Sequence, residues 1–146
     1  MKRLKQAGFS LAAGFSAALA VALFSFFAFW PSRLGHFPPD QWPSLALLGA
    51  LWSSGLGLAT LFVAALRRPP QPVTAALWVA AVLLIQTLWR AVQPWQYYGH
   101  FPTWTLGRDF MPFLPSALAA GLVFGLVARR LGPNNSSKPT PLRGAA

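Results

Sequence analysis

The chain has 146 residues, of which 55% are hydrophobic and 10% charged, and its charges divide into 12 basic and 2 acidic side chains. A soluble domain carries charge on roughly a quarter of its residues, so this composition excludes an ordinary soluble domain and favours a protein embedded in lipid. The chain has no cysteine, which excludes thiol nucleophiles, disulfide exchange and thiolate metal sites.

Four uncharged stretches divide the sequence, and each is long enough for a transmembrane helix, which needs about 20 mostly apolar residues. We therefore predict an all-α membrane protein with a transmembrane domain over residues 1–131. Its four spans are predicted at 9–30, 44–66, 73–92 and 112–130. Prolines separate the spans, because proline lacks the N–H donor that a helix interior requires; they are Pro31, Pro38, Pro39, Pro43, Pro69, Pro70, Pro72, Pro94 and Pro102.

The positions of lysine and arginine predict the orientation of the spans. Arg33, Arg90 and Arg108 fall on one side of the predicted membrane and the other nine basic residues on the opposite side. The side richer in basic residues faces the cytoplasm, so both termini are predicted to be cytoplasmic. An alternative is that residues 1–22 form a cleaved signal peptide, but the apolar stretch continues to Trp30, beyond the typical length of about 7 to 15 residues.

The net charge of +10 would also suit a protein that binds nucleic acid. The basic residues are scattered at predicted helix ends, however, and no soluble domain carries them, so we expect no nucleic-acid partner. We interpret them as topology determinants that also attract anionic lipid headgroups on the inner face. The lipid bilayer is the predicted partner.

The two predicted outer loops share the tetrapeptide Gly-His-Phe-Pro, at 35–38 and at 99–102, and the helix after each copy ends in an arginine pair. This pattern favours two tandem helical hairpins, a parallel repeat related by an axis along the membrane normal. The alternative is a chance tetrapeptide in a chain rich in glycine, phenylalanine and proline.

The same loops hold every acidic and every histidine side chain: His36 and Asp40 in the first, His100 and Asp109 in the second. If the hairpins pack symmetrically, these four side chains would converge on a site for a divalent metal or for acid–base catalysis. The spacing differs between the two loops, which favours a structural role in which the aspartates pair with Arg33 and Arg108. We therefore expect no catalytic residue, no metal and no other cofactor, and we keep the four as weak outer-face candidates.

Small residues recur at four-residue steps in the predicted first, second and fourth spans, which places them on one stripe of each helix. Such stripes let helix backbones approach closely in lipid, where no hydrophobic effect drives association. They predict a compact bundle, and they also suit a homo-oligomer or a membrane-protein partner. The predicted packing residues are Gly14, Gly49, Ser53, Gly57, Gly121 and Gly125.

The predicted third span differs, because it has Gln86 and Arg90 one turn apart and no glycine. We expect Arg90 to extend its guanidinium to the interface while its stem stays among apolar atoms. The alternative is a buried Arg90 that binds an anion or pairs with Asp40 or Asp109, since ionisable groups within spans are costly and often functional.

The acidic residues also bear on transport. Small four-helix multidrug exporters couple drug movement to protons through a glutamate inside the membrane. This chain contains no glutamate and no aspartate within a predicted span. Because a proton relay needs a titratable group at depth, we do not expect export by that mechanism.

Residues 132–146 are polar and show no apolar periodicity, which predicts a disordered tail. The segment NNSSKPTPLRGAA, at 134–146, resembles the carboxyl-terminal ends of proteins encoded by bacterial integron gene cassettes, whose reading frames run into the recombination site of the cassette. The resemblance covers no transmembrane part. It implies a mobile bacterial gene and an inner-membrane location, and it raises the expectation of a role in resistance, stress or defence.

Together these observations predict a small bacterial inner-membrane protein without an identifiable enzymatic activity. We expect it to act through helix packing with itself, with a membrane partner or with lipid. The alternative is a small transporter or permeability factor that uses no intramembrane carboxylate.

Overall fold

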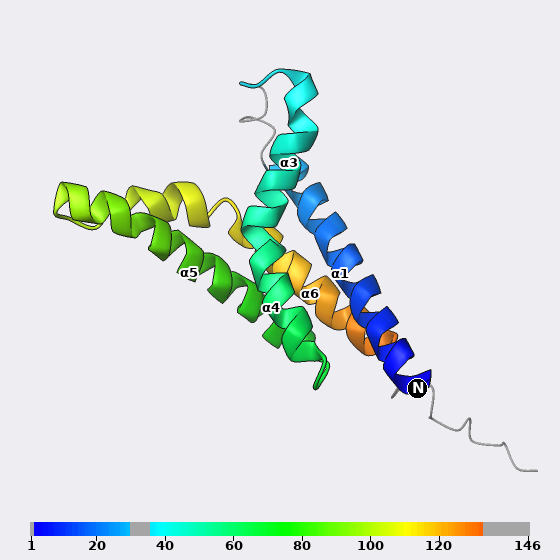
Figure 1. The fold of residues 1–146 in the computed structure, drawn as a ribbon. Coiled ribbons are helices and arrows are strands. Elements are labelled where there is room, and N and C mark those ends of the chain that lie inside the picture. The colour runs from blue at the N-terminus through cyan, green and yellow to red at the C-terminus, as the bar shows by residue number, and fades with distance from the viewer. Residues whose placement is uncertain (1, 30–35, 133–146) are drawn as a thin grey trace, which may run out of the picture.

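The computed structural model describes residues 2–29 and 36–132, and these ranges are helical apart from short connections (Figure 1). The all-α prediction is confirmed for them. The predicted tail from residue 133 onward lies outside the described residues, as do Arg33 and Gly35. In chain order the elements are α1 (Lys2–Phe29), the 3-10 turn η1 (Pro39–Gln41), α3 (Trp42–Ala50), the π-helical segment η2 (Leu51–Gly55), α4 (Leu56–Ala65), α5 (Pro72–Tyr98), the π-helical segment η3 (Leu106–Phe110) and α6 (Leu114–Arg130).

Three helical segments are long and apolar enough to cross a membrane: Lys5–Ala28, Pro39–Ala65 and Pro72–Tyr98. They overlap the first three predicted spans, 9–30, 44–66 and 73–92. In the region of the fourth prediction, α6 has 17 residues, which corresponds to about 26 Å of helix against a hydrocarbon core of about 30 Å. The structure thus has helices suited to a membrane protein, three of which are long enough by themselves.

Two helix ends predicted from proline are wrong. The second membrane-length segment begins at Pro39 instead of residue 44, because Pro39 and Pro43 lie in the first turns of η1 and α3, where the missing N–H has no intrahelical acceptor to lose. Helix α5 does not end at residue 92 but continues through Pro94 to Tyr98. It stops at Gly99, whose φ of 74° requires the left-handed region that glycine adopts easily.

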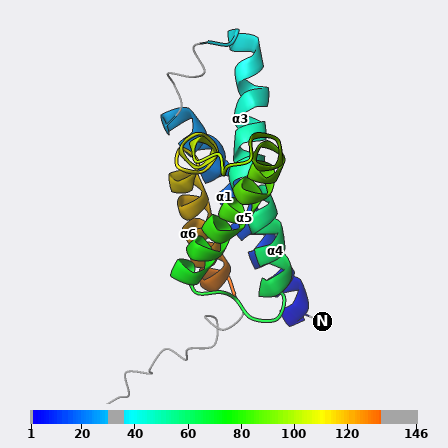
Figure 2. The same ribbon diagram turned by 90° about the vertical axis from the view of Figure 1, so that its left-hand side faces the viewer.

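Helix α6 occupies the middle of the bundle, since it packs extensively against both α1 and α5. The segment from α3 to α4 contacts α1 and, through α4, also α5. Figures 1 and 2 show that the start of α3 extends beyond the rest of the bundle, and Figure 1 shows that it diverges from the end of α5. The start of α1 and the ends of α4 and α6 lie together at the opposite end (Figure 1).

Close backbone contacts hold α6 against α5. A Cβ atom on Gly121 would lie 2.6 Å from the carbonyl oxygen of Ala75, and a Cβ atom on Gly125 would lie 2.6 Å from the Cα of Pro72. Real Cβ atoms do not approach backbone this closely, so only glycine fits at either position without a shift of α5.

The other predicted packing residues also contact neighbours within the chain. A Cβ atom on Gly14 of α1 would lie 3.3 Å from the carbonyl oxygen of Phe124 in α6. Gly57 faces Val79 of α5 and Gly49 faces the ring of Phe26. The small-residue stripes are thus used inside one chain.

Buried serines link three segments of the bundle. The Ser53 hydroxyl donates to the Ala50 carbonyl oxygen at 3.1 Å and lies 3.1 Å from Ser54 Oγ and 3.4 Å from Ser116 Oγ. The Ser116 hydroxyl in turn lies 3.3 Å from the Ala22 carbonyl oxygen, to which it donates. Hydroxyls buried in a bundle of this kind are stable only when they find such partners.

We predict that Gly121→Ala lowers the free energy of unfolding by about 1–3 kcal/mol, because the added methyl group overpacks the contact with α5. Gly8→Ala is the matched control, since a Cβ atom there has no neighbour within 4 Å and alanine favours the helix. Thermal unfolding in an uncharged detergent measures both. Equal stability of the two variants would contradict the packing described for α6.

Candidate functional site

The structure does not bring the predicted outer-face candidates together. Asp40 lies in η1 before α3, and His100 follows the end of α5. The start of α3 and the end of α5 form two arms that diverge from the bundle (Figure 1), so Asp40 and His100 lie on different arms. His36 is exposed ahead of η1, whereas Asp109 lies in η3. Within residues 2–29 and 36–132, no group of three or more histidine and acidic side chains is placed to hold a metal ion.

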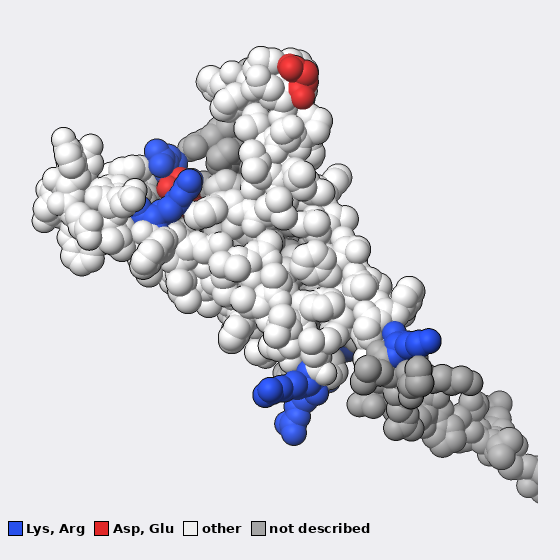
Figure 3. All heavy atoms as spheres, viewed as in Figure 1, with Lys and Arg blue, Asp and Glu red and all other residues white. Residues whose placement is uncertain are grey.

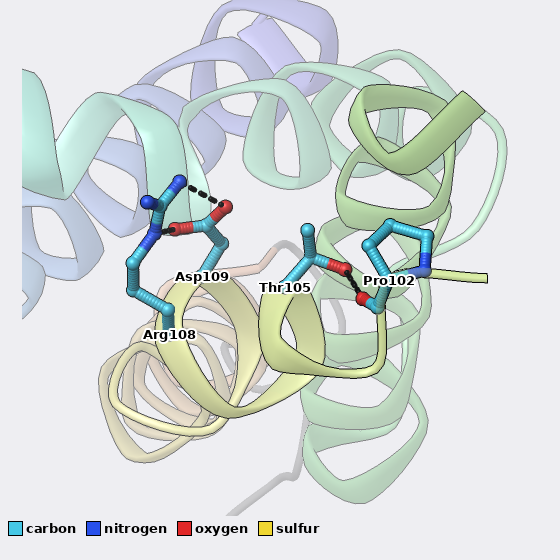
Figure 4. A network of polar contacts seen from close by, with 4 residues as sticks. All are labelled: Pro102, Thr105, Arg108 and Asp109. Carbon is cyan, nitrogen blue, oxygen red and sulfur yellow. Dashed lines mark hydrogen bonds and ion pairs between the residues drawn. The ribbon is translucent and has the colours of Figure 1, made fainter. Parts of the chain in front are cut away.

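Asp109 forms an ion pair with its neighbour Arg108, as the sequence predicts (Figure 4). Arg108 Nε lies 2.9 Å from Asp109 Oδ1, and Arg108 Nη2 lies 3.3 Å from Asp109 Oδ2. The guanidinium also lies 4.6 Å from the centroid of the Trp104 ring. The hydrogen bond that Arg108 donates to the Asp109 carboxylate raises the pKa of Arg108, so this side chain stays charged throughout the usual pH range.

Two hydrogen bonds close the turn before η3. The Thr105 hydroxyl donates to the Pro102 carbonyl oxygen at 2.7 Å, and the Thr105 backbone N–H donates to the same oxygen at 3.0 Å (Figure 4). Both Thr105 and Pro102 are buried. The chain therefore reverses after α5 through a packed turn that directs η3 back toward the bundle.

A cavity of about 630 Å³ lies where the two arms diverge, and we call it the α3/α5 groove. Its polar lining consists of Gln86, Arg90 and Asp109. Its apolar lining comes from α1, α3, η2 and the residue that precedes α6, and includes Phe26, Leu45, Leu48, Trp52 and Phe113. The groove thus joins a few charged and polar groups to an extended apolar wall, which is the composition of a site for an amphipathic molecule.

Arg90 presents its guanidinium in this groove. The guanidinium carbon lies 4.5 Å from the centroid of the Trp52 ring, a cation–π contact that fixes the direction of the side chain. Arg90 is exposed, and the alternative in which it pairs with Asp40 or Asp109 is not formed, because no ion pair joins it to either in the described part of the chain. Its N–H donors make no hydrogen bond to any described residue.

Gln86 lies one turn before Arg90 and also lines the groove. Its side-chain amide makes no hydrogen bond to the described residues. The amide is not fully buried, so a ligand in the groove can reach it. Opposite these polar groups, the rings of Phe26 and Phe113 stack with their centroids 6.1 Å apart. The absence of a side chain on Gly49 makes room for the Phe26 ring.

Two π-helical segments shape the groove, and sequence reasoning missed both. Leu51 and Trp52 in η2 and Asp109 in η3 are lining residues. A π turn inserts an extra residue, turns the following side chains about the helix axis, and often occurs at functional sites. The local sequence signals are weak: serine and glycine at Ser53–Gly55, and Gly107 in η3.

Comparisons of the chain with protein-family models, with curated proteins and with solved structures find no match.

We predict that Asp109→Asn lowers the free energy of unfolding by less than about 1 kcal/mol, because the Arg108 side chain is 54% exposed and hydrated when the pair forms. The loss should disappear at about 1 M salt, where charges are screened within about 3 Å. Asp40→Asn is the control, since Asp40 makes no described contact of this kind and should leave stability unchanged. A loss of several kcal/mol for Asp109→Asn, or equal losses for the two variants, would show that this description of the pair is wrong.

Proposed function

We propose that the chain is a four-span protein of a bacterial inner membrane, with both termini in the cytoplasm, that binds an amphipathic molecule with an acidic head in the α3/α5 groove. The bacterial assignment rests on the cassette-like tail. Support for a fourth span comes from α6, which packs against both α1 and α5 and ends in Arg129 and Arg130. A central helix of 17 residues can span when the flanking turns and arginines reach the interface.

The packing of α1 supports its retention in the mature protein. Leu11, Ala18 and Ala22 of α1 are buried and belong to the hydrophobic core of the bundle. A signal peptide that is cleaved does not contribute to a core, so we propose that residues 1–22 stay in place as the first span.

The topology is open to a direct test, because the chain has no native cysteine. We predict that Gly107→Cys in spheroplasts reacts with a membrane-impermeant maleimide. Lys5→Cys, Arg68→Cys and Arg130→Cys should react only after the membrane is permeabilised. Labelling of Gly107→Cys and Arg130→Cys from the same side would contradict a spanning α6.

Arg90 carries the proposal for the groove. Its guanidinium is held on the Trp52 ring, makes no hydrogen bond to the described residues and faces a cavity with an apolar wall. A guanidinium with unused N–H donors beside an apolar wall favours a carboxylate or another oxyanion. The adjacent apolar wall favours a ligand that also carries a hydrocarbon tail.

We infer a binding role in preference to a catalytic one from the chemistry of the lining groups. A guanidinium does not become deprotonated at ordinary pH, a glutamine amide is not a proton carrier, and the Asp109 carboxylate is engaged by Arg108. These groups hold a charged head in place and do not form a nucleophile–base pair. Self-association through the glycine stripes has less support, since those glycines contact neighbours of the same chain.

We predict that Arg90→Gln lowers the affinity for dodecanoate about tenfold, the loss expected when one charge-assisted interaction is removed. Native mass spectrometry of the full chain released from an uncharged detergent measures the bound fraction. Arg68→Gln removes the same charge at the end of α4, away from the groove, and should change the affinity less than about twofold.

Dodecyltrimethylammonium has the same tail with a cationic head and should bind weakly to the wild-type protein. Equal binding of the two amphiphiles, or equal losses for Arg90→Gln and Arg68→Gln, would overturn the assignment of an acidic head to Arg90.

A further inference from the structure

A second cavity, of about 640 Å³, lies at the opposite end of the bundle, and we call it the arginine pocket. It is bounded by the first turns of α1, the end of α4 with the following connection, and the last turns of α6. Three arginines lie on it: Arg67, Arg129 and Arg130. Its apolar walls include Leu11, Leu66, Leu126, Pro69 and Pro72.

Arg67 and Arg130 form no ion pair within the described residues. The chain has two acidic residues, and both lie at the other end, Asp40 in η1 and Asp109 in η3. Figure 3 shows basic atoms at the lower end of the bundle with no acidic atoms beside them on the visible face. The carboxyl-terminal ends of α4 and α6 each contribute only about half a negative charge, which leaves a positive potential over the pocket.

The backbone fixes the positions from which the arginines extend. At the end of α4 the Arg67 N–H donates to the Ala64 carbonyl oxygen at 3.2 Å. At the end of α6 the Leu131 N–H donates to the Val127 carbonyl oxygen at 3.0 Å. The arginines are therefore carried on two closed helix ends that face one cavity, and not on a free segment of chain.

We propose that the arginine pocket binds the phosphate of an anionic glycerophospholipid, with an acyl chain along Leu11, Leu66 and Leu126. Guanidinium groups bind phosphate oxygens through paired N–H donors, and basic pockets between transmembrane helices on the cytoplasmic side are suited to anionic headgroups. The apolar walls select a phosphate that carries a hydrocarbon chain. This site shares no lining residue with the α3/α5 groove, so either proposal can fail without the other.

Arg67 and Arg68 provide a matched pair for the test. They are neighbours at the end of α4, both exposed, and their replacement by glutamine changes the net charge equally, but only Arg67 lines the pocket. Native mass spectrometry of the full chain in an uncharged detergent, titrated with phosphatidylglycerol, gives the affinity of each variant. We expect Arg67→Gln and Arg130→Gln each to weaken binding about tenfold and Arg68→Gln to weaken it less than about twofold.

Wild-type protein supplies two further comparisons that need no variant to fold. Phosphatidylcholine, which has the same chains and a zwitterionic head, should bind at least about tenfold more weakly than phosphatidylglycerol. Glycerol phosphate, which has the phosphate without chains, should not displace the lipid at equal concentration. Displacement by glycerol phosphate would show a site for free phosphate instead of a lipid. Equal losses of affinity for Arg67→Gln and Arg68→Gln, or equal binding of the two lipids, would overturn the proposal. Phosphatidylglycerol would then bind through nonspecific charge attraction and not in the pocket.

Discussion

The close approach of α6 to its neighbours determines the rest of this structure. In lipid no hydrophobic effect draws helices together, so association depends on van der Waals contact and on hydrogen bonds between helices. Gly121 and Gly125 bring α6 onto the backbone of α5, and Gly14 brings α1 onto α6. Ser53 and Ser116 add a hydroxyl contact between η2 and α6. With α6 held centrally, α3 and the end of α5 diverge at one end of the bundle, and the α3/α5 groove opens between them.

Charge is distributed unevenly along this bundle, and the two cavities differ accordingly. At the groove, Asp109 is engaged by Arg108, while Arg90 rests on the Trp52 ring and retains N–H donors for a ligand. At the other end, Arg67, Arg129 and Arg130 surround a pocket with no acidic side chain of the chain near it. One cavity thus combines mixed charges with an aromatic wall, and the other combines arginines with an aliphatic wall. The same scarcity of acidic residues that favours a membrane location is the basis for proposing that both cavities bind anionic groups.

The sequence predicts the elements of this bundle better than its sites. The lengths of the uncharged stretches identify three membrane-length segments and the region of α6. The recurrence of small residues every four positions identifies Gly121 and Gly125 as packing positions. Proline fails as a stop signal at Pro94, because loss of a single N–H near the end of a long helix does not terminate it. The groove was not predictable, since it depends on the register changes in η2 and η3 and on the divergence of two arms. The shared Gly-His-Phe-Pro tetrapeptide suggested convergence of His100 with Asp40, but Asp40 lies in η1 before α3 and His100 follows α5, on segments that diverge (Figure 1).

The central claim, that the second membrane-length segment and α6 meet inside one chain, is tested by the double variant Ser53→Cys/Ser116→Cys. The two hydroxyl oxygens lie 3.4 Å apart, cysteine is nearly isosteric with serine, and the chain has no other cysteine. Oxidation in membranes should therefore form a disulfide within the monomer, seen as a monomer-sized product with no free thiols. Ser10→Cys/Ser116→Cys is the control: Ser10 lies near the start of α1, whereas Ser116 contacts α1 at Ala22. This variant should retain both thiols. Free thiols in the first variant, or a disulfide-linked dimer, would contradict the account.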